Sequence, residues 1–344
     1  MKFSCSVCDK IYDSSKVPIW LCDCGKPLVV HYNWENKVKS IDVIEDELSL
    51  WRYKSVLPDI ETVISLGEGH TPLIPISNNV YVKDETVNPT GSFKDRGMAL
   101  AVTMAKAQGV ETICLPSAGN AGISAAAYCE AAGIKCNVYL PETIPDPFKK
   151  ETDKYNANLT LSGNTISDAA KHMLKNKEED WFDISTLKEP FRVEGKKTLG
   201  YEIAEQLGWR FPDVVVYETG GGTGLIGMWK AFQEMKGMGW VKGKLPRMVA
   251  AQSDGCAPVV KAFQEREKDT VFWNDSHTIA LGLNVPGPLA GKWILDVLSQ
   301  SNGLAISIPE EDLVASTKEM NDITGINSSA EAGVVWSAYN TLLN

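Results

Sequence analysis

Strand-like and helix-like patterns alternate through most of this chain, and this alternation limits the possible folds more than any other feature of the sequence. Short runs rich in β-branched and apolar residues precede longer stretches with helical periodicity. The strand-like runs are 80–83, 110–115, 135–140, 159–161, 214–217, 247–252 and 304–308, and the helical patterns are 98–107, 121–132, 148–155, 166–175, 198–207, 225–236, 257–265 and 310–320. Such units predict an α/β fold with parallel sheets and helices on both faces. Ligands of these folds bind beyond the carboxyl ends of the strands.

The segment 88–97, Asn-Pro-Thr-Gly-Ser-Phe-Lys-Asp-Arg-Gly, places one lysine where a loop turns into a helix. Asn-Pro and Thr-Gly break the chain, so Lys94 is expected in the first helical turn. The helix dipole and partial burial disfavour a second positive charge there. Both effects favour the neutral amine that forms an imine with an aldehyde cofactor. The alternative is a surface lysine in a charged Lys-Asp-Arg patch.

A glycine-rich turn follows the strand-like run 214–217. It reads Glu-Thr-Gly-Gly-Gly-Thr-Gly over 218–224 and leads into a helical pattern. Its four glycines and a hydroxyl at the start of the helix let several backbone amides converge on an anion, as in a phosphate cradle. A Walker-type Gly-Lys-Ser/Thr is missing, and the spacing is not that of the dinucleotide-binding glycines. A reactive amine together with a phosphate cradle indicates pyridoxal 5′-phosphate (PLP).

A third loop, 117–120, reads Ser-Ala-Gly-Asn and precedes the small-residue helical pattern 121–132. Asn, Ser and Gly at the start of a helix offer amides and hydroxyls to a carboxylate. The alternative is an ordinary helix cap.

Five segments in this order resemble the threonine synthase family of PLP enzymes, which belongs to the tryptophan-synthase-β-like group (fold type II). They are 67–73, 88–97, 117–120, 194–198 and 218–224. The resemblance covers nearly the whole chain and implies two domains with parallel-type sheets. We expect an N-terminal ribbon over 1–32, a large PLP-binding domain over 33–95 and 186–344, and a small α/β domain over 96–185. The group's habit also implies a homodimer.

The resemblance also assigns roles to single residues. Lys94 is the expected catalytic residue and, with Phe93, binds the cofactor. Asn120 would meet the phenolic oxygen of PLP, and Ser117 with the neighbouring amides, including Gly119, would hold the α-carboxylate of the substrate. Thr90 is a further expected substrate-binding residue. The remaining cofactor residues are the cradle Gly220, Gly221, Gly222, Thr223 and Gly224, together with Ser329 near the pyridine nitrogen.

Arg192 lies where the family carries an arginine that clamps the phosphate of O-phosphohomoserine. A guanidinium suits bidentate binding of phosphate. A salt bridge to Glu189 or Glu194 is the alternative. For Ser329 and its neighbour Ser328 the alternative is a helix cap, because the family's matching hydroxyl falls on Ala332.

The function implied by the resemblance is a lyase reaction that converts O-phospho-L-homoserine and water to L-threonine and phosphate. A second interpretation keeps PLP but changes the reaction to β-elimination or β-replacement on serine, threonine or O-phosphoserine, as in dehydratases or cysteate synthase. The departures from the family pattern at Ala118, Thr186, Leu187 and Ala332 support this alternative. A third interpretation is a non-enzymatic zinc-ribbon binding protein.

Four of the eight cysteines lie near the N-terminus as Cys5-x-x-Cys8 and Cys22-x-Cys24. This spacing predicts a small ribbon that holds one structural zinc ion tetrahedrally, against a metal-free remnant as the alternative. The other four lie among apolar or small residues and are expected to be buried fillers: Cys114, Cys129, Cys136 and Cys256.

The overall composition is that of a soluble globular protein, with 44% hydrophobic and 23% charged residues. The formal net charge of −10 argues against a nucleic-acid partner. The sequence has no signal-peptide pattern and no apolar stretch of membrane-spanning length. We therefore expect a cytoplasmic protein with reduced thiols, no membrane partner and a small amino-acid substrate.

Overall fold

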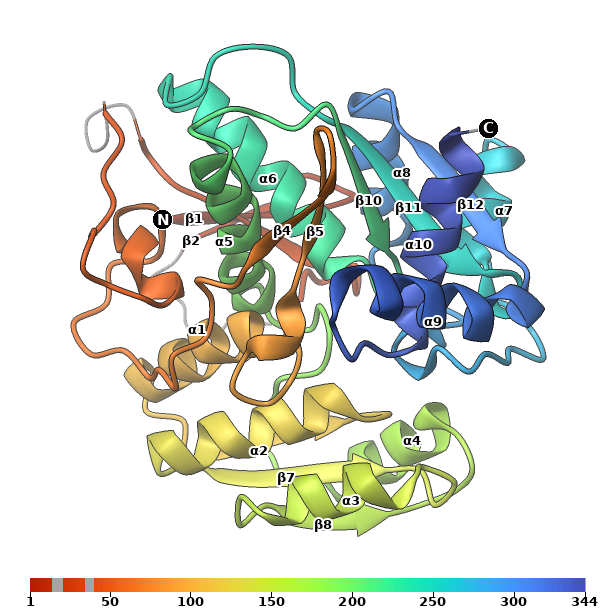
Figure 1. Cartoon of the computed structure of the whole chain (residues 1–344). Coiled ribbons are helices and arrows are strands. Elements are labelled where there is room, and N and C mark those ends of the chain that lie inside the picture. Colours follow the sequence, from red (N-terminus) through yellow and green to blue (C-terminus); the bar gives the residue numbers. More distant parts are fainter. Residues whose placement is uncertain (14–20, 35–39, 344) are drawn as a thin grey trace. The chain divides into compact units, whose positions relative to one another are not determined.

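The computed structural model describes residues 1–13, 21–34 and 40–343 and divides them into two compact units. The first unit contains the described residues of Met1–Tyr32, Asp42–His70 and Val87–Lys196. The second contains Thr71–Thr86, the described residues of Lys197–Asn344 and those of 33–41. Figure 1 labels their elements along the chain. The division into three domains expected from the sequence stays a prediction.

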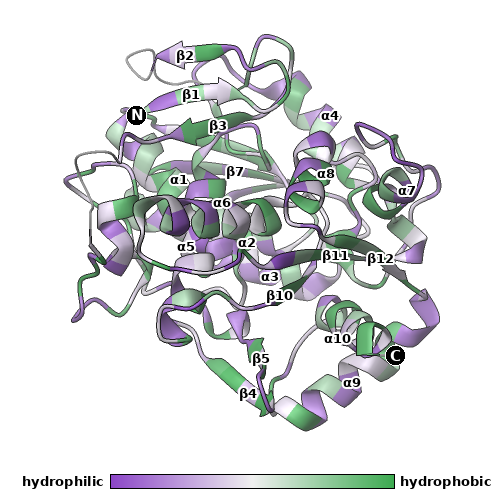
Figure 2. Ribbon diagram, turned by 90° about the horizontal axis from the view of Figure 1, so that it is seen from above, coloured by the Kyte–Doolittle hydropathy of each residue, from purple (hydrophilic) through white to green (hydrophobic). Residues whose placement is uncertain are grey.

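The N-terminus of the first unit forms a three-stranded antiparallel sheet in the order β2-β1-β3. The strands are β1 (Lys2–Cys5), β2 (Ile11–Asp13) and β3 (Leu28–His31). Phe3 pairs with Val30 and Cys5 with Leu28, and all four side chains are buried. Figure 2 shows the apolar residues of β3 in green. The small cysteine ribbon is therefore present, with residues 14–20 outside the described part of the chain.

The first unit also holds a parallel sheet in the order β8-β7-β6-β9, coloured yellow to green in Figure 1. Its strands are β6 (Thr112–Pro116), β7 (Lys135–Leu140), β8 (Asn158–Leu161) and β9 (Phe182–Asp183). Around it lie α1 (Lys94–Ala107), α2 (Asn120–Ala132), α3 (Asp146–Asp153) and α4 (Ile166–Asn176). The 3-10 helix Leu50–Val56 belongs to the same unit.

Alternating side chains of these strands face two different helical layers. Ile113 and Leu115 of β6 belong to a large core with residues of α1 and α2. Cys114, which lies between them, packs with Ala169 and Met173 of α4. The predicted parallel sheet with helices on both faces is thus confirmed.

Helix α5 (Phe191–Gln206) begins earlier than the sequence pattern indicates. The prediction of a helix start at Thr198 is wrong by seven residues. The carboxylate of Glu189 accepts the backbone N–H groups of Phe191 at 2.7 Å and of Arg192 at 2.8 Å. This bond set satisfies two of the donors that every helix start leaves open.

The second unit is built on a parallel sheet in the order β10-β11-β12. The strands are β10 (Val214–Glu218), β11 (Arg247–Ser253) and β12 (Leu304–Ile308). Helices α6 (Thr223–Met238), α7 (Pro258–Gln264) and α8 (Gly291–Gln300) contact β11. Helix α10 (Ala330–Leu343) packs across all three strands, and α9 (Leu313–Thr324) packs on α10.

A hairpin completes the second unit. The predicted strand 80–83 is β5 (Val80–Lys83), and it pairs antiparallel with β4 (Leu73–Ser77). The turn between them uses Asn79 with a φ of 61°. Asn tolerates this left-handed conformation better than most residues, which explains its place in a tight turn.

Two further expectations concern burial and apolar length. The four cysteines outside the ribbon are buried and unpaired, as expected for fillers. Within the described residues, every helix is too short or too polar to cross a membrane.

Candidate cofactor and substrate site

Lys94 is the first residue of α1, as the sequence predicts, and its side chain is half-buried. Its Nζ lies 3.8 Å from the centroid of the Phe93 ring. The Nζ of Lys196, a buried residue of α5, lies 4.3 Å from the same centroid. The aromatic face therefore holds two amino groups beside the start of α1. Lys196 lies in the family-like segment 194–198, but its contact with Phe93 could not be predicted, because the ring is about a hundred residues away along the chain.

The loop before Lys94 is held by the carboxylate of Asp95, which is fully buried. Asp95 accepts hydrogen bonds from the Thr90 N–H at 2.7 Å, from the Thr90 hydroxyl at 2.6 Å and from the Ser124 hydroxyl of α2 at 2.5 Å. These bonds close the turn and fasten it to α2. The hydroxyl of Thr90 already serves this loop, and its expected role in substrate binding stays a prediction.

The loop 117–120 is fixed by the hydroxyl of Ser117. This oxygen accepts the N–H groups of Gly119 at 3.1 Å and Gly122 at 2.9 Å, so the helix-cap alternative describes Ser117. Gly119 has a φ of 141°, and a Cβ there would lie 2.9 Å from the Phe148 ring, so glycine is required. Asn120 is the half-buried first residue of α2. Contacts of Ser117, Gly119 and Asn120 with substrate or cofactor stay predictions.

Arg192 is 1% exposed at the start of α5. Its guanidinium donates to the carbonyl of Ile184 at 2.9 Å, whereas its Nε has no acceptor among the described residues. The carboxylate of Glu189 accepts the backbone N–H groups at the start of α5. In the described part of the chain Arg192 forms no ion pair, so the salt-bridge alternative is not supported. Burial lowers the pKa of Arg192 and raises the pKa of Glu189 to about 7. A buried guanidinium with an open donor is suited to an anionic ligand.

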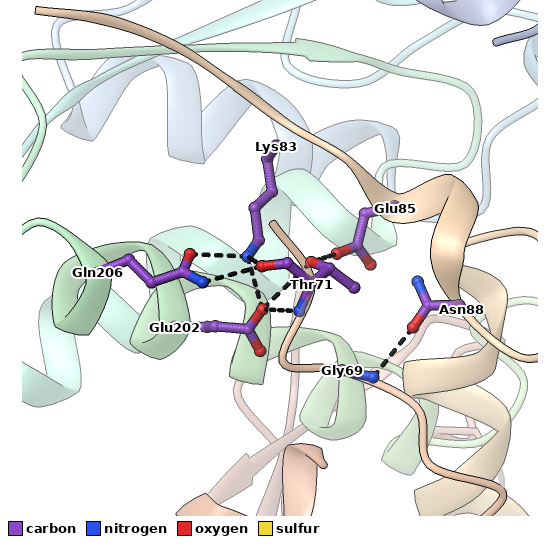
Figure 3. Close-up of polar contacts among 7 residues, drawn as sticks. All are labelled: Gly69, Thr71, Lys83, Glu85, Asn88, Glu202 and Gln206. Carbon is purple, nitrogen blue, oxygen red and sulfur yellow. Dashed lines mark hydrogen bonds and ion pairs between the residues drawn. The ribbon is translucent and has the colours of Figure 1, made fainter. Parts of the chain in front are cut away.

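The segment 67–73 is held by hydrogen bonds in both units, drawn in Figure 3. In the first unit, the Gly69 N–H donates to the side chain of Asn88 at 3.0 Å and so joins the start of the Lys94 loop. In the second unit, Thr71 donates its N–H to Glu202 at 2.8 Å. The half-buried Lys83 donates from its Nζ to the Thr71 carbonyl and to Glu202, each at 2.6 Å. Each unit therefore fixes its own part of the segment.

The glycine-rich turn of the second unit lies between β10 and α6. In the described part of the chain, no hydrogen bond uses the N–H groups of Gly220, Gly221 or Gly222 as donors. Gly222 has a φ of +78°, the left-handed region that favours glycine. Open amides at a helix start are the donors that a phosphate group requires. The turn thus fits the cofactor's phosphate, with Thr223 and Gly224 as the first residues of α6.

Close packing beneath this turn explains why its residues are so small. A Cβ at Gly222 would overlap the side chain of Ile294, and a Cβ at Gly224 would overlap the hydroxyl of Tyr217. At Gly220 a Cβ would lie 2.9 Å from the carbonyl oxygen of Gly282. Any side chain at these positions would push the turn away from its support.

The serine pair before α10 has partners within the second unit. Ser329 is exposed and donates its hydroxyl to Glu331, and Ser328 bonds the side chain of Asn321 through both its N–H and its hydroxyl. Both hydroxyls donate to side-chain oxygens, so these contacts do not decide for the helix-cap alternative. The role of Ser329 near the pyridine nitrogen stays a prediction.

The four N-terminal cysteines come together in the first unit. All Sγ atoms of Cys5, Cys8, Cys22 and Cys24 lie within 4.8 Å of one another. The N–H groups of Val7 and Cys8 donate to the Sγ of Cys5 at 3.4 Å. Four sulfur ligands at zinc-sulfur distances of about 2.3 Å require sulfur atoms roughly 3.8 Å apart, so the cluster suits a tetrahedral metal ion.

Comparisons with known proteins agree with these features. The family model for pyridoxal-phosphate dependent enzymes matches residues 64–344. The threonine synthase of Methanocaldococcus jannaschii is 35% identical over 336 residues, which cover 94% of this chain and 82% of the relative. The threonine synthase of Methanosarcina acetivorans is 30% identical over 333 residues, with the same coverage.

Solved structures share the fold at lower identity. A fungal L-serine ammonia-lyase from Rhizomucor miehei has a TM-score of 0.72 and 18% identity, and the match covers 82% of this chain and 88% of that one. Maize serine racemase has a TM-score of 0.67 and 19% identity, covering 78% and 80%. The family model and the two threonine synthases show that the chain belongs to the pyridoxal-phosphate-dependent enzymes, and within them to the threonine synthase family of lyases.

Proposed function

We propose that this chain converts O-phospho-L-homoserine and water to L-threonine and phosphate. The single observation that supports this substrate most directly is Arg192. Its guanidinium is buried and its Nε has no acceptor among the described residues. A buried charged donor without a partner is costly, and a substrate phosphate would supply the missing acceptor.

Some residues of the chain are suited to binding the cofactor, and others to the reaction itself. The open amides of Gly220, Gly221 and Gly222 are suited to the phosphate of PLP, and Lys94 is suited to its aldehyde. When bound, PLP supplies an electron sink for negative charge that develops beside the substrate's amino group.

Lys94 also serves as the base of the proposed reaction. Its amine removes the proton at Cα and then a proton at Cβ, so that phosphate leaves from Cγ. A proton returns to Cγ, which becomes the methyl group, and water adds its hydroxyl at Cβ while its proton goes to the departing phosphate. A proton then returns to Cα, and the product is threonine. Arg192 holds the phosphate group, and the amides at the start of α2 hold the α-carboxylate.

The test compares three substrates on the purified protein with PLP. O-phosphohomoserine, O-phosphoserine and threonine are each incubated with the enzyme while phosphate, ammonia and amino-acid products are measured. Threonine and phosphate in equal amounts from O-phosphohomoserine are the expected result. Ammonia from threonine without phosphate release from O-phosphohomoserine would favour the β-elimination alternative and contradict the proposal.

Zinc is the proposed occupant of the cysteine cluster. The sulfur atoms are close enough for tetrahedral coordination, and the N–H groups that point at Cys5 would stabilise thiolate charge. The metal would be structural, because four thiolates leave no open position for a substrate.

The cellular setting is also part of the proposal. We infer a cytoplasmic homodimer that binds neither nucleic acid nor membrane. The net charge of −10 disfavours phosphate backbones, and the unpaired cysteines agree with a reducing compartment.

A further inference from the structure

The cysteine ribbon shares one core with the helices that carry Lys94 and Arg192. Phe3 and Cys5 lie on the same face of β1, and both are 1% exposed. They belong to a continuous hydrophobic core with residues of α1 and with Phe191 of α5. The ribbon is therefore packed into the first unit as part of its core.

Two contacts from the ribbon reach the first turn of α5. The Phe3 ring meets the Phe191 ring edge-on, with centroids 6.0 Å apart and planes at 82°. Tyr32, the residue after β3, donates its hydroxyl to the carboxylate of Glu194 at 2.8 Å. Phe191 and Glu194 are three residues apart on one face of α5, and Arg192 lies between them. The ribbon thus holds the helix turn from which the guanidinium extends.

The cysteine cluster lies on and next to the strands that make these contacts. Cys5 is two residues from Phe3 on β1, and Phe3 pairs with Val30 of β3, two residues before Tyr32. A metal ion that joins Cys5 to Cys22 and Cys24 would fix β1 against the turn that leads into β3. Loss of the metal would free both contact residues at once.

The start of α5 in turn contacts α1 very closely. A Cβ at Gly195 would overlap the carbonyl oxygen of Arg96, and a Cβ at Gly97 would lie 3.0 Å from the carbonyl oxygen of Arg192. Helices that touch backbone to backbone leave little room for independent movement. A displacement of the first turn of α5 therefore reaches the helix that begins with Lys94.

We propose that the metal-loaded ribbon is a positioning element for substrate phosphate: Phe3 and Tyr32 hold the first turn of α5, and thereby Arg192, in the binding arrangement. The inference rests on the proposed function for the identity of the phosphate substrate. Phe3 and Tyr32 act through α5 and are positioning residues.

The first experiment follows hydrogen exchange of the backbone amides of 191–196 before and after removal of the metal by a chelator. We expect faster exchange at these amides without metal and recovery when Zn²⁺ is added. The amides of α10 in the second unit are the internal control and should keep their protection. Unchanged exchange at 191–196, or a protein that binds no metal, overturns the inference.

The second experiment keeps the metal and removes one hydrogen bond. In Tyr32→Phe we expect KM for O-phosphohomoserine and the inhibition constant of inorganic phosphate to rise about three- to tenfold, with kcat changed less. Tyr155→Phe is the matched control, a half-buried tyrosine of the same unit. Wild-type phosphate inhibition in Tyr32→Phe overturns the inference.

These readouts separate two kinds of failure. Hydrogen exchange requires no substrate, so it tests the link between ribbon and α5 even if the enzyme acts on another amino acid. If the metal-free protein unfolds, Tyr32→Phe still tests the inference, because this variant retains all four cysteines.

Discussion

Helices α1 and α5 begin in the first unit at loops held by buried carboxylates, whereas α6 of the second unit begins at a loop built from glycines. Asp95 binds the turn before Lys94, and Glu189 binds the first amides of α5. At α6, Gly222 and Gly224 instead allow close contact with the side chains beneath.

This difference shows two ways in which the start of a helix can contribute to a binding site. A carboxylate consumes amides and hydroxyls, and it fixes the position from which one side chain extends, Lys94 on α1 or Arg192 on α5. Glycines leave the amides open and make the backbone itself the ligand of an anion. The first arrangement suits a reactive or clamping side chain, and the second suits the phosphate of a cofactor.

The largest expected effect comes from removing the side chain that the first arrangement presents. Lys94→Ala should lower turnover by about 10³-fold or more, because both the cofactor's covalent partner and the base are lost. The absorption band of the covalently held cofactor should disappear, while the glycine turn should still bind PLP reversibly. Spectra before and after dialysis measure both. The control is Lys106→Ala, at an exposed lysine in the last turn of the same helix. Retained turnover in Lys94→Ala would end the proposal.

Addition of one methyl group should displace the glycine turn at the start of α6. Gly224→Ala places a Cβ against the hydroxyl of the buried Tyr217. We expect a loss of stability of about 1–3 kcal/mol and weaker PLP binding, because overpacking displaces the turn. Gly237→Ala lies in the same helix with nothing within 4 Å of the added atom, and should stabilise by about 0.5–1 kcal/mol. Chemical denaturation and PLP titration test the pair. Equal effects of the two substitutions would contradict the packing argument.

Local signals were sufficient to predict where both arrangements lie. Asn-Pro and Thr-Gly predicted the start of α1 at Lys94, and the glycine run after a strand predicted the start of α6. Both depend on backbone preferences of a few neighbouring residues. The alternation of strands and helices likewise predicted the parallel sheets.

Contacts between distant residues could not be predicted from these signals. Ser124 bonds Asp95 from 29 positions away, and Tyr32 bonds Glu194 across 162. The early start of α5 was missed because Glu189 caps the helix through its side chain, next to a proline that indicates a break. Polar side chains that accept hydrogen bonds from buried amides do not recur at regular intervals in the sequence. They can therefore be identified only from the fold.

Asp95→Asn tests the carboxylate arrangement without a change of shape. The amide group offers one acceptor oxygen where the carboxylate offers two, so the Thr90 N–H and two hydroxyls compete for it. We expect a loss of about 2 kcal/mol in stability and a lower kcat, with PLP retention unchanged because the glycine turn is intact. Asp146→Asn, at an exposed aspartate of α3, is the control. Loss of PLP in Asp95→Asn would show that the two arrangements are not independent.

The last expected effect appears only when the pH changes, and it is one that only the carboxylate arrangement can have. Burial raises the pKa of Glu189 to about 7, above the value of about 4.3 of an unfolded glutamate. The folded state therefore holds the proton more tightly. The stability from this group is fully present below about pH 4.3 and is lost as the pH rises through about 7.

Glu189→Gln should flatten this part of the stability profile. Between pH 5 and pH 8 the unmodified protein should lose about 2–3 kcal/mol through Glu189, whereas the glutamine variant, which cannot ionise, should keep its value. Urea denaturation at several pH values measures the difference, with the exposed Glu142→Gln as the control. Parallel profiles for the Glu189 variant and the unmodified protein would mean that the carboxylate is charged in the folded state, held by the two amides of α5. In that case Glu189 would still cap α5 as a carboxylate, and the contrast between the two kinds of helix start would remain, without a pH dependence from this group.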